Sequence, residues 1–65
     1  MHTITFDYDT YGGEYVVLID DRPTIYTDTA KDARKWAYYA GSVYWPARID
    51  FGSGHIVVVK KEMDE

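Results

Sequence analysis

The alternation of apolar and polar side chains in the first nine residues is the feature that most restricts the fold. Between His2 and Asp9, the apolar positions are 4, 6 and 8, and threonine or aspartate occupies the positions between them. A period of two over this length predicts a β-strand with one apolar face. Gly12 and Gly13 follow, and a Gly-Gly pair supplies the positive φ angles that a tight hairpin needs. We therefore expect the chain to begin with a β-hairpin.

The return strand of this hairpin, Glu14 to Asp20, differs from the first because it is apolar on both faces. Strands of this kind are usually central and covered on both sides. A second turn is expected at residues 20–23, because Pro23 fixes φ. Thr24 to Thr27 is then predicted as a short third strand.

A helix is expected after the third strand. Asp28 or Thr29 can cap its N-terminus, since either side chain can accept a hydrogen bond from a free backbone N–H. Alanines at positions 30, 33, 37 and 40 fall on one arc of this helix, with Trp36 at the edge of the arc. We expect the alanine face to lie close to the sheet, Trp36 to be a main core anchor, and Gly41 to end the helix.

Two further strands complete the expected sheet. Val43 to Phe51 is predicted as the fourth strand, and Pro46 within it predicts a sheet edge or a bulge because proline cannot donate a ladder hydrogen bond. Residues 52–54 form a hairpin turn, and His55 to Lys60 is the fifth strand. The expected fold is one α+β domain over residues 1–65 in the order β-β-β-α-β-β. Its sheet is mostly antiparallel, one helix packs on one face, and residues 61–65 are a solvated tail.

The chain has 65 residues and no cysteine. A domain of this size buries only about 60% of the surface that its unfolded chain exposes. Without cysteine it has no disulfide and no thiolate metal ligand, so aromatic residues, 17% of the chain, are expected to supply much of the stabilisation. The longest apolar runs, such as Tyr15 to Ile19, are far too short to span a membrane, and a cytoplasmic protein is expected.

No arrangement of side chains predicts catalysis, a metal or a cofactor. His2 and His55 do not follow a metal-binding spacing, and His2 stands next to the terminus. Ser53 and His55 could form a nucleophile and its base, but serine beside glycine is ordinary in a turn. We therefore expect a protein that is not an enzyme and that binds no metal or cofactor.

Negative charge is concentrated in the first half of the chain. The net charge is −4, and residues 1–32 carry seven acidic and two basic side chains, against four acidic and five basic in residues 33–65. Such a surface repels nucleic acid and attracts basic protein partners. Mild acidity also keeps a small protein soluble, and this alternative stays open.

Two groups of residues are candidates for binding a protein partner. In the first group, Asp7 and Asp9 lie about 6.8 Å apart on one strand face, so its carboxylates could imitate a phosphate backbone. This acidic group consists of Asp7, Asp9, Tyr11, Glu14, Asp20 and Asp21. The alternative group is aromatic and consists of Tyr44, Trp45 and Arg48. Arg48, Lys60 and Lys61 also leave open a small nucleic-acid-binding module, in which bases would stack on aromatic rings.

Residues 4–37 resemble HicB-type antitoxin domains. Those domains carry a Gly-Gly-Tyr hairpin, an Asp-x-Pro turn, and a Gly-Asp-Thr helix start followed by an acidic residue and alanine. The matching segments here are Tyr8-Asp9-Thr10-Tyr11-Gly12-Gly13-Glu14-Tyr15-Val16-Val17, Asp21-Arg22-Pro23, Thr27-Asp28-Thr29 and Asp32-Ala33. The chain lacks the Gly-Cys that follows the proline in that family and the DNA-binding tail of many members. The resemblance implies an antitoxin that neutralises a small RNase toxin.

The chain as a whole also resembles small phage-encoded inhibitors of host machinery, including anti-CRISPR proteins. It shares with them the lack of cysteine, the acidity, the aromatic content and the single helix. The leading expectation is a non-enzymatic inhibitor that binds a basic, nucleic-acid-handling surface of a host complex in the host cytoplasm. The HicB-like antitoxin and the nucleic-acid-binding module are the alternatives. Because one helix covers only one sheet face, a homodimer through the other face also stays open.

Overall fold

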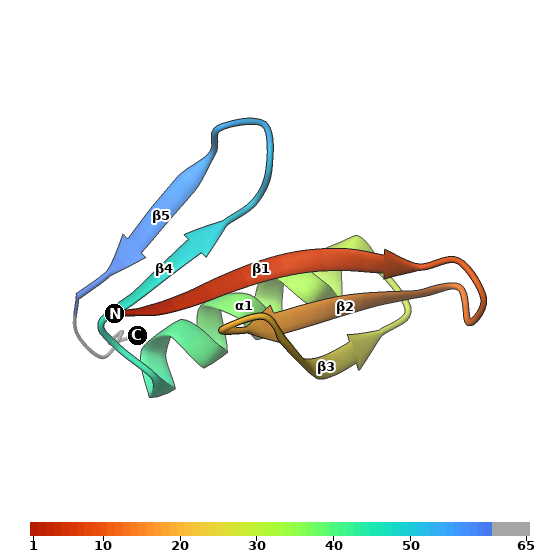
Figure 1. Cartoon of the computed structure of the whole chain (residues 1–65), viewed down its shortest axis with the longest axis horizontal. Coiled ribbons are helices and arrows are strands. Elements are labelled where there is room, and N and C mark those ends of the chain that lie inside the picture. Colours follow the sequence, from red (N-terminus) through yellow and green to blue (C-terminus); the bar gives the residue numbers. More distant parts are fainter. Residues whose placement is uncertain (61–65) are drawn as a thin grey trace.

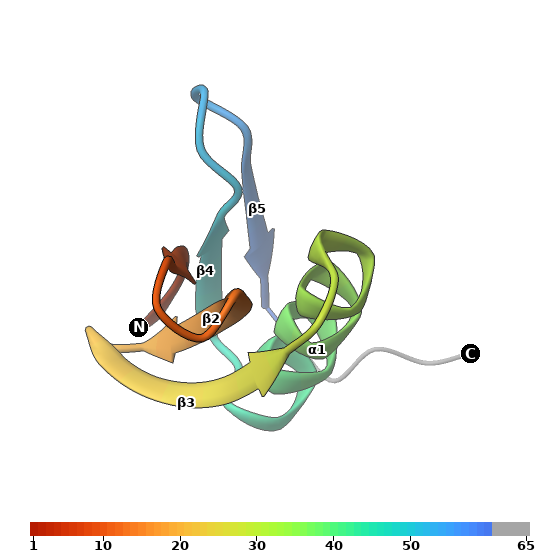
Figure 2. The same ribbon diagram turned by 90° about the vertical axis from the view of Figure 1, so that its right-hand side faces the viewer.

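The alternating segment at the N-terminus forms the middle strand of a five-stranded sheet. In the computed structural model, which describes residues 1–60, the strands lie side by side in the order β3-β2-β1-β4-β5 and one helix packs against one face (Figures 1 and 2). Among these described strands, only β1 and β4 are parallel neighbours. The mostly antiparallel α+β fold is therefore confirmed. The elements are β1 (His2–Asp9), β2 (Glu14–Ile19), β3 (Arg22–Thr27), α1 (Ala30–Val43), β4 (Ala47–Asp50) and β5 (Ile56–Val59).

The core lies between α1 and the sheet face formed by the alternating apolar positions. Ile4, Val17 and Ile49 come from three adjacent strands and are its largest fully buried side chains. The alanine face of α1 packs on them, with Ala33 and Ala37 also buried. Burial of one valine or isoleucine side chain contributes about 1.5–3 kcal/mol, so Ile4, Val17 and Ile49 provide much of the stability.

The sheet divides where β4 leaves β1. The parallel ladder between these strands covers only three residue pairs, from His2–Ala47 to Ile4–Ile49. β1 continues alongside β2 alone, while the β4–β5 hairpin turns away from it (Figure 1). The far part of the β1–β2 hairpin, residues 7–14, consequently projects from the body of the domain, and we call it the prong.

The turn between β2 and β3 differs from the predicted one. Asp20 and Asp21 are its two central residues, and both have positive φ (53° and 65°) as in a type I′ hairpin. Pro23 lies within β3, opposite Leu18 beside a register shift. The proline is tolerated there because β3 is an edge strand, so β3 begins two residues earlier than expected.

The helix begins as predicted but ends later. The Thr29 hydroxyl accepts a hydrogen bond from the backbone N–H of Asp32 (3.1 Å), which makes Thr29, and not Asp28, the N-cap. Gly41 does not end the helix, which continues to Val43. A Cβ at position 41 would lie only 3.1 Å from Cγ2 of Val59, so the glycine permits close approach of α1 to the sheet.

The predicted fourth strand is too long at its start. Val43 still belongs to α1, Tyr44 is the helix C-cap, and a cis peptide bond joins Trp45 to Pro46 before β4 begins. The carbonyl of Pro46 accepts a hydrogen bond from the backbone N–H of His2 (3.1 Å). The expectation of an edge strand or of a bulge at Pro46 is also wrong, because Pro46 lies before β4 and β4 lies between β1 and β5.

Trp36 is not a core residue. Its side chain is 44% exposed and packs edge-on against Tyr39 on the outer surface of α1. Position 36 lies about 100° around the helix from Ala37, which turns it away from the sheet.

The second face of the sheet is partly covered by its own side chains. Val16 is buried there, whereas Tyr26 and, on β5, Ile56 and Val58 stay exposed. The helix of the described chain is neither long nor apolar enough to cross a membrane. The tail predicted for residues 61–65 lies outside the described residues.

Candidate protein-binding surface

The tip of the prong is built around Asp9. Its backbone carbonyl accepts a hydrogen bond from the N–H of Gly13 (2.8 Å), and its carboxylate accepts one from the N–H of Tyr11 (2.9 Å). Only Gly13 of the glycine pair has a positive φ, 68°. The loop holds Tyr11 at its apex with a fully exposed side chain (101%).

Three carboxylates share the face of the prong that points away from α1. Asp9 is paired directly with Glu14 across the hairpin, and Asp7 lies two residues before Asp9 on the same strand face. Gly12 lies against this pair, since a Cβ there would be 2.9 Å from an Asp9 oxygen and 3.2 Å from a Glu14 oxygen. None of the three carboxylates forms an ion pair with a base among residues 1–60. They form a localised negative charge available to a partner.

Asp7 has a second role at the edge of β1. Its carboxylate accepts a hydrogen bond from the backbone N–H of Tyr8 (2.8 Å). β4 has already diverged from β1 at this point. Asp7 therefore satisfies a backbone donor that faces no other strand of residues 1–60, and a charge at this position discourages pairing with another chain.

The other two predicted acids lie at the opposite end of β2. Asp20 and Asp21 are separated from Glu14 by the length of the strand, about 20 Å at the usual rise per residue. The Asp20 carboxylate accepts hydrogen bonds from Nδ1 of His2 (2.6 Å) and the backbone N–H of Thr3 (2.9 Å), and these bonds lower the pKa of Asp20. The predicted acidic group thus divides into the prong and a separate strand-end cluster.

The alternative aromatic group is also divided. Tyr44 contacts His2 edge-on, with ring centroids 5.4 Å apart, and with Asp20 it lines a shallow hollow of about 440 Å³. Trp45 is 49% exposed in the connection that follows. Arg48 lies on β4 between Thr3 and Val58, on the sheet face away from α1. No single surface brings these three side chains together in the way that the prong gathers its carboxylates.

The histidines and serines occupy ordinary structural positions. His55 packs edge-on against Phe51, and Ser53 lies in the turn between Gly52 and Gly54 with φ 52°. The Ser42 hydroxyl donates to the carbonyl of Tyr39 (2.7 Å). Across residues 1–60, no three His, Asp or Glu side chains gather in a way that could hold a metal ion.

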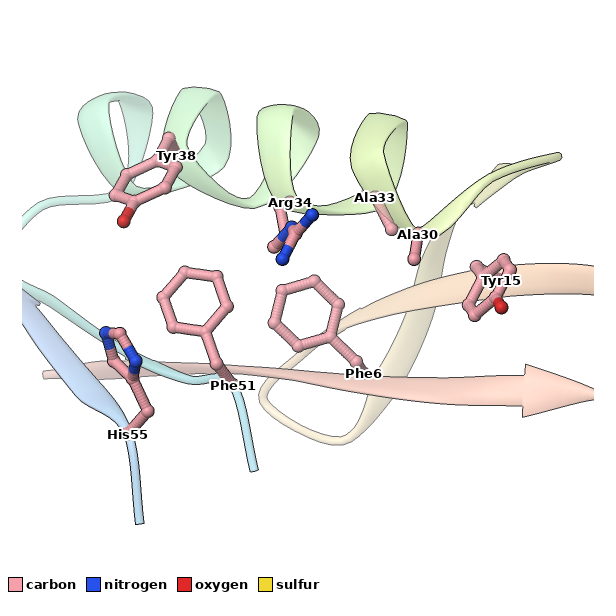
Figure 3. Close-up of a pocket in the computed structure, with 8 residues that line it drawn as sticks. All are labelled: Phe6, Tyr15, Ala30, Ala33, Arg34, Tyr38, Phe51 and His55. Atoms are coloured by element: carbon pink, nitrogen blue, oxygen red, sulfur yellow. The ribbon is translucent and has the colours of Figure 1, made fainter. Parts of the chain in front are cut away.

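A groove that the sequence patterns do not predict lies beneath α1 at the point where the sheet divides. Figure 3 shows that it is formed by side chains from β1, β2, α1 and the β4–β5 turn region, and its volume is about 450 Å³. Phe6 and Phe51 stack in it, with ring centroids 5.3 Å apart. The signal available in the sequence was that both phenylalanines fall on the same apolar faces as Ile4 and Ile49. Their proximity depends on β4 lying next to β1, which the sequence does not reveal.

Comparison with known proteins adds no relative: no family model, no curated protein and no solved structure matches the chain. The resemblances to HicB-type antitoxins and to phage inhibitors therefore depend only on the residues and general features described above.

Proposed function

We propose that this protein acts without catalysis, by inserting the prong into a basic groove of a larger nucleic-acid-handling protein and blocking it. This is the mode of a phage-encoded inhibitor acting in the host cytoplasm. The observation that carries the proposal is the tip of the prong, where a fully exposed Tyr11 stands beside three carboxylates without basic partners in the described chain.

The charge of the prong suits a site that normally holds phosphates. Proteins bind nucleic acid largely through Lys and Arg side chains that neutralise phosphate groups. Carboxylates fixed on a strand can occupy the same side chains, and Asp7, Asp9 and Glu14 are fixed by backbone register. Attraction between the two surfaces would mainly accelerate association, and added salt would slow it.

Tyr11 provides the apolar contact that charge alone does not. Interfaces depend on a few anchors, among which tyrosine is enriched, more than on total area. The ring of Tyr11 stands at the apex of a loop held by two hydrogen bonds to Asp9, so little conformational freedom of the loop backbone would be lost on binding.

A HicB-like antitoxin would use the same surface on a different target. The residues that carry this resemblance form the β1–β2 hairpin, the β2–β3 turn and the start of α1, so they include the prong. A small RNase toxin is also a protein that handles nucleic acid. The two functions are therefore distinguished by the identity of the target and not by the binding mode.

The test uses a charge-neutralised prong with its hydrogen bonds retained. The triple variant Asp7→Asn, Asp9→Asn, Glu14→Gln keeps the acceptor oxygens for the N–H groups of Tyr8 and Tyr11. The matched control removes three charges elsewhere, through Asp21→Asn, Asp28→Asn and Asp32→Asn. Each protein is immobilised and exposed to a bacterial lysate, and captured proteins are identified by mass spectrometry.

We expect the wild type and the control to capture a nucleic-acid-binding protein, and added duplex DNA or RNA should displace it. The prong variant should capture at least about tenfold less of this protein. The purified target should also lose its nucleic-acid binding when this protein is added. The proposal is wrong if the prong variant captures as well as the wild type, or if the target still binds nucleic acid normally. If capture is lost only in the triple variant Tyr44→Ala, Trp45→Ala, Arg48→Ala, the interface is formed by those residues and not by the prong.

A further inference from the structure

The groove beneath α1 exists because the sheet divides. Phe6 projects from β1 and Phe51 follows β4, and their stacked rings form one apolar wall at the point of division. Ala30 and Ala33 of α1 face them and are too small to fill the space (Figure 3). A volume of about 450 Å³ lies in the usual range for small-molecule sites, roughly 300–1,000 Å³.

The polar groups of this groove are arranged on its helix side and at its outer end. Arg34 extends from α1 toward the two phenyl rings, and the hydroxyl of Tyr38 points toward the sheet from the next turn of the helix (Figure 3). His55 lies beyond Phe51, with ring centroids 5.2 Å apart. These side chains offer a guanidinium, a hydroxyl and a ring nitrogen to whatever occupies the space.

The charge of the groove is opposite to that of the molecule. The chain has a net charge of −4, yet the groove is lined by Arg34 and His55 and by no carboxylate. Arg34 forms no ion pair within residues 1–60. A guanidinium presents a planar fork of N–H donors that matches a carboxylate. Arg34 is exposed at the mouth of the groove, so it can meet an entering anion without rearrangement of the core.

From these features we infer that the groove is a binding site for a small planar aromatic carboxylate of one or two fused rings. The ring system lies between the phenyl rings of Phe6 and Phe51 and the alanines of α1. The carboxylate accepts hydrogen bonds from the guanidinium of Arg34. This site lies on the helix side of the sheet, whereas the carboxylates of the prong face the other side, so either proposal can fail without the other.

The test compares an anion with its neutral analogue. The full chain, labelled with ¹⁵N, is titrated with 2-naphthoate and with 2-naphthamide, and amide shifts are followed by NMR. We expect naphthoate to shift the signals of residues around Phe6, Arg34 and Phe51 and to bind about two- to fivefold more tightly than the amide, the gain expected from an ion pair with an exposed guanidinium.

Two variants locate the charge that matters. Arg34→Met removes the guanidinium with little change in helix propensity and should reduce naphthoate affinity to that of the amide. Lys35→Met removes the same charge from the next position, which lies with Trp36 and Tyr39 on the outer surface of α1, and should leave naphthoate affinity unchanged.

Three results would overturn the inference. They are equal binding of the acid and the amide, shifts centred on Trp36 and Tyr39, and absence of binding of either compound at millimolar concentration. The comparison of acid with amide uses the wild type alone, so it decides the question even if Arg34→Met does not fold.

Discussion

At the scale of single residues, Asp20 shows how one side chain can serve the fold from an exposed position. Its backbone adopts the positive φ of the β2–β3 turn, and its carboxylate holds the start of β1 through His2 and the N–H of Thr3. Asp20 was predicted as a partner-binding residue because sequence shows its charge and not its hydrogen bonds. Those bonds exist because the end of β2 lies beside the start of β1.

The lowered pKa of Asp20 predicts a dependence of stability on pH. The hydrogen bond from His2, and then that from Thr3, favour the ionised carboxylate in the folded state. The stabilisation is therefore fully present above the ordinary aspartate pKa of about 4, and is lost as pH falls through the lower folded value. A carboxyl ¹³C titration should give an Asp20 midpoint below that ordinary value.

Two variants test this prediction, and each replaces one of the two histidines with glutamine. His2→Gln should raise the Asp20 midpoint, whereas His55→Gln, far from the turn, should not change it. An Asp20 midpoint that His2→Gln leaves unchanged would contradict the role given to the imidazole.

Trp36 provides a second prediction at this scale. A buried tryptophan replaced by alanine usually costs about 3–5 kcal/mol of unfolding free energy. Because Trp36 is half exposed on α1, and alanine is the better helix former, we expect Trp36→Ala to cost only about 1 kcal/mol. Ile49→Ala, at a fully buried position, should cost about 2–5 kcal/mol. Urea unfolding followed by circular dichroism would measure both, and the reverse order of these costs would place Trp36 in the core.

At the scale of the elements, patterns local in sequence predict which strands and helix exist, and tertiary contacts determine where they end. Alternation and turn residues suffice for the five strands and their order along the chain. The late end of α1 could not be predicted, because Gly41 is typical of a helix stop. Its actual role depends on Val59 and Ile49, which come from strands far along the chain.

The close approach at Gly41 predicts a coupled pair of substitutions. Gly41→Ala gains up to about 1 kcal/mol of helix propensity, but its methyl group meets Val59 and Ile49, and overpacking costs about 1–3 kcal/mol. We expect a net loss of stability. When Gly41→Ala is combined with Val59→Ala, the new methyl group at position 41 enters the space left by the valine side chain. The double variant should therefore be more stable than the sum of the two single effects predicts. Strict additivity in urea unfolding would contradict this packing.

At the scale of the whole molecule, the division of the sheet gives β1 two different halves. The backbone N–H groups of its even-numbered residues face β4, as the hydrogen bond from His2 to Pro46 shows. Ile4 has β4 beside it, whereas Phe6 and Tyr8 lie beyond the ladder. The division of the sheet also creates the groove beneath α1. The division and the groove both depend on the position of β4 beside β1. The proximity of Asp7, Asp9 and Glu14 needs only the hairpin, so the sequence predicts it. The projection of the prong and the groove depend on the position of β4, which the sequence does not predict.

Hydrogen exchange should separate the two halves of β1. The amide of Ile4 should exchange slowly, near the limit set by global unfolding, while those of Phe6 and Tyr8 should exchange at least about tenfold faster through local opening. NMR exchange of the three amides in one sample measures this directly. Equal protection of all three would mean that another chain covers this edge in solution.

The outer strand β5 has a consequence for how the protein behaves at high concentration. Residues 56–59 contain no charge and no proline, and Ile56 and Val58 are exposed on β5, whose outer backbone edge pairs with no other strand of residues 1–60. Such an edge has few of the features that prevent filament growth, so electrostatic repulsion between molecules must do so. That repulsion vanishes near the isoelectric point of about 4.9. The acidic residues of the prong and of the β2–β3 turn therefore help to keep the distant β5 from aggregating, and colloidal stability should be lowest in mildly acidic solution.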